Sequence, residues 1–339
     1  MAKVPIFKLK YQGKDITQNI KPLTTSIAYT DKLEGSSDEI EVSLDNADLR
    51  WMDSWLPKEG DLITLQMGYE GEVLFPEVNG EIDEPEYQGP PDTLRLQAQA
   101  TPITASLRQR RTQAYEKTTL RAIAQQIAGR HGLELVGNVP DLRLERVTQK
   151  EQTDLEFLLE QSQEYGLVFK IEGAKRLVFY KIEDLEKAPA VLTLDRTDLR
   201  SYRLTRKTKG TYKAAKIKYY NPATGKYIEV TIDANGSVLP KPKEGDQEQA
   251  VGDILNIRER VENLDQAKER AKEALRRENS NRIELDIDLE GNVVLAAGIN
   301  FNLTSFKKFD GKFMIEQVKH SLTKRQGYQC SVKGRRVEQ

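Results

Sequence analysis

The segment Glu39-Ile40-Glu41-Val42-Ser43-Leu44 alternates polar and aliphatic residues without interruption. Successive side chains of a β-strand point to opposite faces, so this segment predicts a strand with one buried face and one solvated face. The same alternation occurs on both sides of it, in residues 7–11, 63–67 and 94–100, with turn residues at 57–61. Several short strands separated by turns predict a β-barrel or β-sandwich over residues 1–105.

Helical periodicity replaces this alternation after Thr101. Apolar residues recur on one helical face in residues 120–128, and a second helix begins at the capping box formed by Thr153 and Glu156. Two apolar runs on either side of Gly173 predict a hairpin. Residues 106–189 are therefore expected to form a small α+β unit inserted in the chain.

Alternation returns from Tyr212 onward and recurs in several segments up to about residue 336. A helix is expected over about 263–279, with a stripe of small residues that lets it lie close to a sheet. We assign residues 211–339 to a second β domain that carries this helix, and residues 190–210 as a completion of the first. Together the segments predict an α+β chain that is mostly β.

The two β regions share a loose internal echo. Residues 56–65 and 295–303 each contain a leucine, a glycine turn and a strand. Residues 75–82 and 309–315 then each contain a phenylalanine, a glycine turn and a further strand. The echo suggests two related barrels separated by an inserted domain. Chance recurrence of short β motifs accounts for it equally well.

Composition excludes several classes of function. The chain has 52 basic and 53 acidic side chains, a net charge of −1, so it has no overall field that attracts nucleic acid. One cysteine cannot form an intramolecular disulfide, and two histidines leave little room for a histidine-rich metal site. No apolar stretch approaches the roughly 20 residues that span a bilayer, so no membrane anchor is expected.

Motifs for catalysis or cofactor binding are absent from the sequence. It contains no phosphate-binding loop, dinucleotide-binding glycine pattern, nucleophile elbow or zinc-protease motif. His131 follows a predicted helix and His320 lies in a predicted strand. A structural role is favoured for both over that of a general base. Cys330 is expected to be a small buried or half-buried residue. We therefore expect no catalytic residue, no cofactor and no metal.

Two basic stretches and one tryptophan pair are candidate contact sites. The stretches contain Arg108, Arg110 and Arg111, and then Arg203 and Arg206. They lack interleaved aromatic residues and lie near the expected domain junctions, so we interpret them as contacts between domains or subunits rather than with nucleic acid. Trp51 and Trp55 share a face if their segment is helical. A packed plug beneath the first barrel is favoured over an interface anchor.

Further motifs occur in a specific order. The middle unit contains TLRAIA at 119–124, RHGL at 130–133, QTDLEFL at 152–158 and EYG at 164–166. The C-terminal part contains FDGKF at 309–313, VKHSL at 318–322 and GY at 327–328. Their order and spacing resemble the phage late control D family, the baseplate hub proteins of contractile tails.

This resemblance implies an architecture and a function. It implies two tube-type β-barrel domains with an inserted α+β domain, in a non-enzymatic structural protein. The hub is expected to be a homotrimer in which six similar barrels adapt a six-fold tail tube to a three-fold spike. The expected partners are the tube protein, a separate spike protein and other baseplate proteins. Its expected location is the bacterial cytoplasm during assembly and then the tail baseplate of a virion or injection particle.

Two other classes of function remain as alternatives. One is a tail-tip enzyme that degrades the cell wall, either a glycosidase or a peptidase, although no acid pair or zinc-binding set stands out. The other is a regulator that binds nucleic acid, which the net charge of −1 disfavours.

Overall fold

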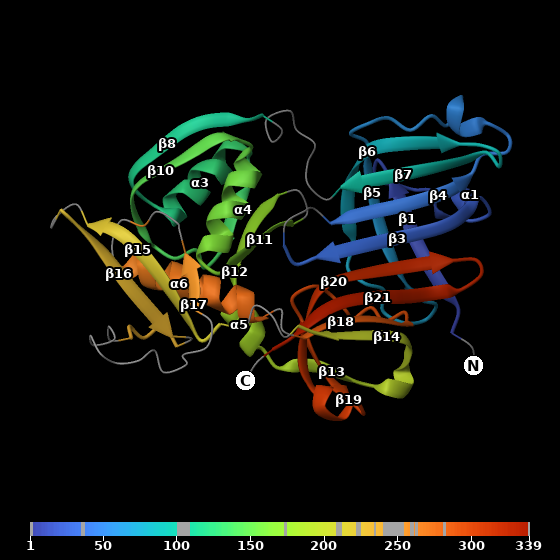
Figure 1. Ribbon diagram of the computed structural model, residues 1–339. Helices are drawn as coiled ribbons and strands as arrows, with labels where there is room; N and C mark the ends of the chain where they lie inside the picture. Colours follow the sequence, from blue (N-terminus) through green and yellow to red (C-terminus); the bar gives the residue numbers. More distant parts are fainter. Residues whose placement is uncertain are drawn as a thin grey trace.

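The structure is a computed structural model. It describes residues 3–34, 38–99, 109–172, 175–207, 212–221, 225–233, 235–239, 254–257, 261, 264–280 and 283–337. The described chain is mostly β, as predicted, and Figure 1 shows a β part on one side and a mixed α and β part on the other.

The first β unit occupies the N-terminal third of the chain. Its main strands follow the order β3-β4-β7-β6-β5-β1 in the sheet. Ile40, Val42 and Leu44 are fully buried in its core, as their alternation predicts. The elements are β1 (Pro5–Tyr11), β2 (Lys14–Asp15), α1 (Thr17–Ile20), β3 (Thr24–Lys32), β4 (Glu39–Asp45), η1 (Arg50–Met52), β5 (Leu62–Tyr69), β6 (Val78–Gln88) and β7 (Thr93–Gln99).

The second β unit combines two segments that are distant in the sequence. Its strands follow the order β14-β18-β21-β20-β19-β13. The elements are β13 (Ala190–Asp195), η2 (Arg196–Asp198), β14 (Leu199–Arg206), β18 (Ile283–Glu290), β19 (Asn300–Thr304), η3 (Lys307–Phe309), β20 (Gly311–Thr323) and β21 (Gly327–Arg336).

Residues 190–206 therefore belong to the second unit. This corrects our expectation that they complete the first. Complementary side chains on β14 and β18 explain this pairing. Arg203 Nη2 donates to Asp286 Oδ2 at 2.8 Å, and Ser201 Oγ donates to Asp288 Oδ2 at 2.6 Å.

The mixed part contains the predicted middle unit. Helix α3 buries its predicted apolar face, α4 buries Phe157 and Leu158, and Thr153 and Glu156 form the predicted capping box. A two-stranded antiparallel sheet of β8 and β10 and a three-stranded sheet in the order β11-β12-β9 complete this unit. The elements are β8 (Arg111–Thr119), α3 (Leu120–Arg130), β9 (Glu134–Gly137), β10 (Arg143–Gln152), α4 (Asp154–Glu164), β11 (Leu167–Glu172), β12 (Arg176–Lys181) and α5 (Ile182–Lys187).

A second sheet and its helix belong to the mixed part rather than to the second β unit. Strands β15 (Ala214–Asn221), β16 (Lys226–Asp233) and β17 (Ile254–Ile257) form this sheet, and α6 (Leu264–Ser280) packs against it. Gln266 Nε2 of α6 donates to the backbone oxygen of Arg143 at 3.0 Å. The segment expected as one domain over 211–339 is thus divided between two parts of the structure, and β18 begins the return to the β part.

One ladder joins the two β units into a 13-stranded sheet. The second half of β20 pairs antiparallel with β3, from Gln317 opposite Lys32 to Thr323 opposite Ser26. Figure 1 shows these two strands side by side. The strand path stays open in the described part of the chain, with β14 at one end and β2 at the other.

The strand orders of the two units are the same. Counted along the chain within each unit, β1, β3, β4, β5, β6 and β7 correspond to β13, β14, β18, β19, β20 and β21. One pair differs, because β1 is antiparallel to β5 whereas β13 is parallel to β19. Ile63 and Leu65 of β5 and Phe301 and Leu303 of β19 are all fully buried. The internal echo therefore coincides with a repeated topology.

Candidate assembly surfaces

An ionic joint connects both β units to the mixed part. Lys170 Nζ of β11 contacts Asp31 Oδ1 of β3 and lies 3.2 Å from Asp38 Oδ2. The backbone N–H of Ala297 donates to Asp31 Oδ2 at 2.8 Å. Burial would lower the pKa of Lys170, but Asp38 and Asp31 outweigh burial and raise it. Burial and the charge of Asp31 raise the pKa of Asp38 despite Lys170. These charges hold three parts of the chain together.

A second ionic joint lies beside a cavity of about 540 Å³ between the mixed part and the sheet. Glu186 of α5 accepts from Arg276 Nη1 at 2.9 Å and from Arg335 Nη2 at 2.6 Å. Burial raises the pKa of Glu34 and of Glu316 in the cavity wall. Paired charges line this cavity. The ion pairs hold α6 and α5 against the sheet.

The first basic stretch lies within the mixed part. Arg110 is exposed, donates to the backbone oxygen of Glu151 at 3.2 Å and lies 3.7 Å from Glu156. Arg111 is half-buried, and its Nε lies 3.9 Å from Asp154. Arg108 lies outside the described residues. The structure thus brings Arg110 and Arg111 to the β8–β10 sheet and the start of α4, and the Arg110 side chain is exposed.

The second basic stretch lies on β14 at one end of the strand path. Arg203 is exposed and pairs with Asp286, and Arg206 is exposed at the last position of the strand. Lys207 follows and contacts Glu284. These cations therefore lie along a sheet edge, far in the fold from Arg110.

The tryptophan pair divides into a buried and an exposed member. Trp51 is buried, and its indole Nε1 donates to the backbone oxygen of Asp45 at 3.1 Å. Trp55 is 39% exposed, packs edge-on against Trp51 with ring centroids 5.2 Å apart, and lies under the Arg50 guanidinium. Trp51 therefore closes the core of the first unit, as the plug interpretation predicts, while Trp55 faces outward.

Trp55 lies in a segment with three other exposed apolar side chains. The sequence analysis did not identify this group. Leu49, Met52 and Leu56 are each about half exposed. Leu56 also lines a pocket of about 360 Å³ together with Trp51 and Trp55. Their clustering on one short turn before Pro57 was the available signal. Large apolar side chains that gather on a surface are typical of contact sites.

His131 takes part in a buried network that no short motif predicted. Its Nε2 lies 2.8 Å from Asp154 Oδ2, and Arg130 Nη1 donates to the same carboxylate at 2.8 and 2.7 Å. Gln149 donates a further bond at 2.9 Å. Burial alone would raise the pKa of Asp154, but the bonds from Gln149, His131 and Arg130 lower it. The network ties α3 to the start of α4, a structural role for His131.

His320 is also held by partners that its local sequence did not identify. Its Nε2 donates to the backbone oxygen of Leu295 at 3.0 Å, so its Nδ1 accepts from Tyr328 Oη at 2.8 Å. Burial lowers the pKa of His320. Cys330 is buried, as expected, and burial raises its pKa to about 12. These contacts assign His320 a place in the packing of the second unit.

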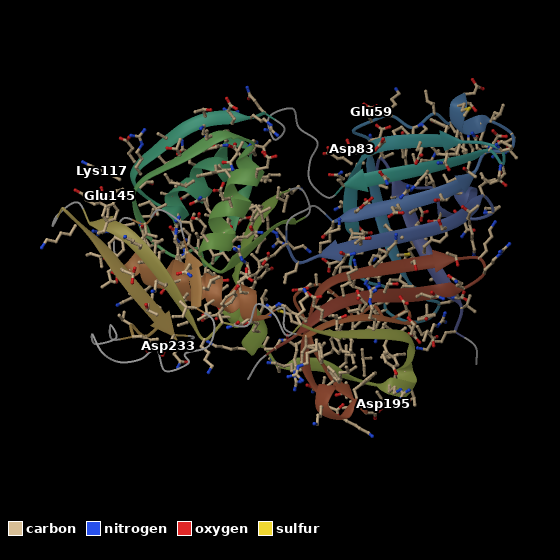
Figure 2. All side chains as sticks on the ribbon, in the orientation of Figure 1. Glu59, Asp83, Lys117, Glu145, Asp195 and Asp233 are labelled. Carbon is tan, nitrogen blue, oxygen red and sulfur yellow. The ribbon has the colours of Figure 1, made fainter. Side chains whose placement is uncertain are left out.

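The described residues contain no group of three or more histidine, cysteine or acidic side chains placed to hold a metal ion. None of the described helices is long and apolar enough to cross a membrane. Figure 2 shows charged side chains distributed around both parts, with Asp83 on the first β unit and Asp195 at the far end of the second.

Comparison with known proteins gives this arrangement a family. The family model described as phage tail baseplate hub (GPD) matches residues 57–326. The chain belongs to this baseplate hub family. A probable baseplate hub protein of Escherichia phage 186 is 25% identical over 246 residues, which cover 71% of this chain. The match spans 61% of the length of that hub protein.

Solved structures share the fold of this hub-family chain at low sequence identity. A tail protein from Neisseria meningitidis MC58 aligns with a TM-score of 0.69 and 13% identity, over 98% of this chain and 96% of its own. An Escherichia coli component of the type VI secretion system aligns with a TM-score of 0.59 and 14% identity, over 96% of this chain and 76% of its own. That component is itself described as similar to two tail proteins of bacteriophage T4.

Proposed function

We propose that this chain is the structural hub of a contractile tail or injection machine, a homotrimer that adapts a six-fold tail tube to a three-fold spike. The observation that carries the proposal is the repeated strand order of the two β units. Three copies of a chain with two similar units present six similar units around one axis. Such a ring offers six-fold contacts on one side and three-fold contacts on the other.

In this proposal each β unit is a tube-type barrel domain, and the mixed part is inserted between them. The partners are the tail tube protein, a spike protein and other baseplate proteins. Membership of the baseplate hub family and the fold shared with a type VI secretion component support these partners. Assembly takes place in the bacterial cytoplasm, and the finished hub lies in the baseplate of the particle.

The exposed members of the predicted contact set are proposed interface residues. Arg110, Arg203 and Arg206 would meet acidic side chains of other subunits, and Trp55 would anchor an apolar contact. Trp51 and Arg111 would support their neighbours from inside the fold. Exposed charges and one aromatic anchor are a composition found in protein interfaces that assemble from folded parts.

We propose that the hub is not an enzyme, and its family supports this because the matching relative is described as a baseplate protein. Purified protein incubated with peptidoglycan in a zymogram should leave it intact. Cleared peptidoglycan, at the mass of this chain, would restore the cell-wall-degrading alternative.

The assembly proposal is tested by light scattering of the purified protein across concentrations, with and without its spike protein. The expected mass of the hub alone is three times 38.6 kDa. When the spike protein is bound, its mass is added to this value. A monomer at every concentration, even with the spike protein present, would remove the proposal.

A further inference from the structure

Two irregular positions recur in both β units. The β6–β7 ladder shifts register between Ile82 and Glu84, and the β20–β21 ladder shifts between Ile315 and Gln317. The two shifts lie at the same spacing of 233 residues (315 − 82 and 317 − 84). Bulges re-aim a strand and are specific features of a fold. The second halves of β6 and β20 are therefore equivalent strands.

Strands β3 and β14 correspond in the same way. The β3–β4 ladder shifts between Thr24 and Ser26, and the β14–β18 ladder shifts between Leu199 and Ser201. Both positions differ by 175 residues (199 − 24 and 201 − 26). Each strand of the joint between the units thus has a counterpart in the other unit.

Two pairings of this kind are possible, β20 with β3 and β6 with β14. The joint within the chain uses only the first. It pairs β20 with β3, and places Lys319 opposite Thr30. The equivalent residues are Glu86 on β6 and Thr205 on β14. In the described part of the chain β6 pairs with β5 only over residues 78–81, so residues 84–88 have a strand partner only in β7. Likewise β14 has a strand partner only in β18.

The two free edges lie far apart within one copy. Along the described strand path they are separated by β18, β21, β20, β3, β4 and β7. Figure 2 places Asp83, on β6, and Asp195, shortly before β14, at opposite ends of the β part. One edge can therefore meet the other only on a neighbouring copy.

The charges on the two edges are opposite in sign. The β6 edge with the residue before it carries three acidic residues, and β14 with the residue after it carries four cations. They are Asp83, Glu84 and Glu86 on the first edge, and Arg200, Arg203, Arg206 and Lys207 on the second. Opposite charges on facing strands favour their pairing, whereas like charges would oppose the pairing of two identical edges.

We propose that residues 84–88 of one copy pair antiparallel with β14 of the next copy, so that each contact between copies repeats the joint within the chain. This inference rests on the proposed trimeric hub. In the repeated register Glu86 lies opposite Thr205 and Glu84 lies opposite Lys207. Such a head-to-tail contact uses two different surfaces of each copy, which is what a closed ring requires. Pro85 carries no N–H, so side chains supply part of the contact.

Arg203 has a specific place in this register. It pairs with Asp286 of its own copy and lies diagonally across from Glu86 of the next one. At the joint within the chain, the Lys319 ammonium pairs with Glu41 at 3.1 Å across β3. At the joint within the chain the cation is on β20, whereas at the proposed joint between copies it is on β14. Both joints therefore alternate acidic and basic groups.

A cross-link between copies tests the pairing directly. One chain carries Glu86→Cys and a second, distinguishable by a tag, carries Thr205→Cys. Both side chains are exposed, Cα atoms of opposed residues are about 4.5–5.5 Å apart, and a disulfide spans about that distance. Mild copper-phenanthroline oxidation of the mixed chains should give a cross-linked pair of both tags. Cys330 is buried and adds little background.

Two matched pairs accompany this experiment. Lys319→Cys with Thr30→Cys in one chain should cross-link internally, since these residues face each other in the structure. Glu86→Cys with Tyr227→Cys, which places the second thiol on the exposed face of β16, should give no defined product. A trimer by light scattering with no Glu86–Thr205 cross-link would overturn this joint while leaving the hub. A chain that stays monomeric with its spike protein would overturn both.

Charge exchange gives an independent readout. Glu84→Lys alone and Lys207→Glu alone should each reduce the trimer fraction several-fold, and the double exchange should restore it. Lys216→Glu, at a comparable exposed pair with Glu229 in the β15–β16 hairpin, should leave the trimer unchanged. Equal loss in both single variants with no recovery in the double variant would contradict the register.

Discussion

His320 of β20 lies directly opposite Tyr29 of β3, with the two rings stacked at 6.2 Å. This pair is at the centre of the ladder that joins the two β units. The imidazole is fixed by Leu295 on one side and Tyr328 on the other. His320, for which the sequence favours a structural role, therefore lies in the ladder on which the proposed ring depends.

Replacing this histidine should weaken the fold and leave function in the molecules that still assemble. His320→Ala removes a buried ring and both of its hydrogen bonds, so we expect a loss of about 2–4 kcal/mol in the free energy of unfolding. His131→Ala, which leaves the buried Asp154 carboxylate without one donor, should cost about 1–3 kcal/mol. Urea denaturation measures both losses.

Particles assembled with either variant distinguish a structural role of the histidine from a catalytic role. They should infect or kill as well as wild-type particles of equal number, because neither histidine touches a reacting group in this account. A correctly assembled particle that is inert with His131→Ala or His320→Ala would contradict the non-enzymatic hub.

The pH dependence of stability should carry the signature of His320. Burial lowers its pKa in the folded chain, although the Leu295 hydrogen bond and the Asp31 charge oppose this. The unfolded chain therefore takes up a proton first as the pH falls below about 6.5. Stability from this group is complete above that pH and is lost as the pH falls through the folded pKa.

The matched variant for this effect is His320→Gln. Although less stable than wild type at pH 7.5, it should lose less stability than wild type between pH 7 and pH 5. Buried Glu34 and Glu316 act in the opposite direction, since their raised pKa values favour the folded state at lower pH. They are present in both proteins, so the difference between the two curves isolates His320. Parallel curves would contradict its buried neutral state.

The ionic joint at Asp31 should be essential for the position of the mixed part. Lys170→Met leaves Asp31 and Asp38 close together without their cation, so we expect a loss of about 3 kcal/mol in unfolding free energy. Lys187→Met removes an exposed cation from its pair with Glu183 and should cost less than about 0.5 kcal/mol. Equal denaturation midpoints for both variants would show that the joint adds no stability.

The sequence predicted the parts of the fold in which periodicity and neighbours agree. Strand β4 and helices α3 and α4 lie where their patterns place them, and the Thr153 capping box forms as predicted. Local patterns do not reveal which distant strand a segment pairs with. Strand β14 joins β18 through Arg203 and Asp286, which are 83 residues apart, and no nearby residue signals that choice.

The contact residues were predictable only in part. Trp51 and Trp55 were identified by their spacing, but only the fold separates the buried plug from the exposed ring. The partners of His131 and His320 come from other elements of the fold, so their sequence neighbours carry no trace of them. Residues 84–88 form the second half of β6, but their acidic residues and Pro85 are not a strand signal in the sequence.

The proposed trimer should weaken as salt concentration rises. Its contacts involve exposed charges, which contribute at most about 1 kcal/mol each and are screened by salt. Arg203→Glu should lower the trimer fraction more than Arg110→Glu, because Arg203 lies on the proposed strand joint. Sedimentation at 50 mM and 500 mM salt measures both effects. A trimer insensitive to salt and to Arg203→Glu would remove the electrostatic part of the account.

Electron-microscopy class averages of the purified protein bound to its spike protein test the central claim most directly. We expect a ring with three copies of the chain, in which six similar β units surround one axis and the mixed parts project outward in threes. Particles that show a single copy, or a ring whose β units do not repeat six times, would contradict it.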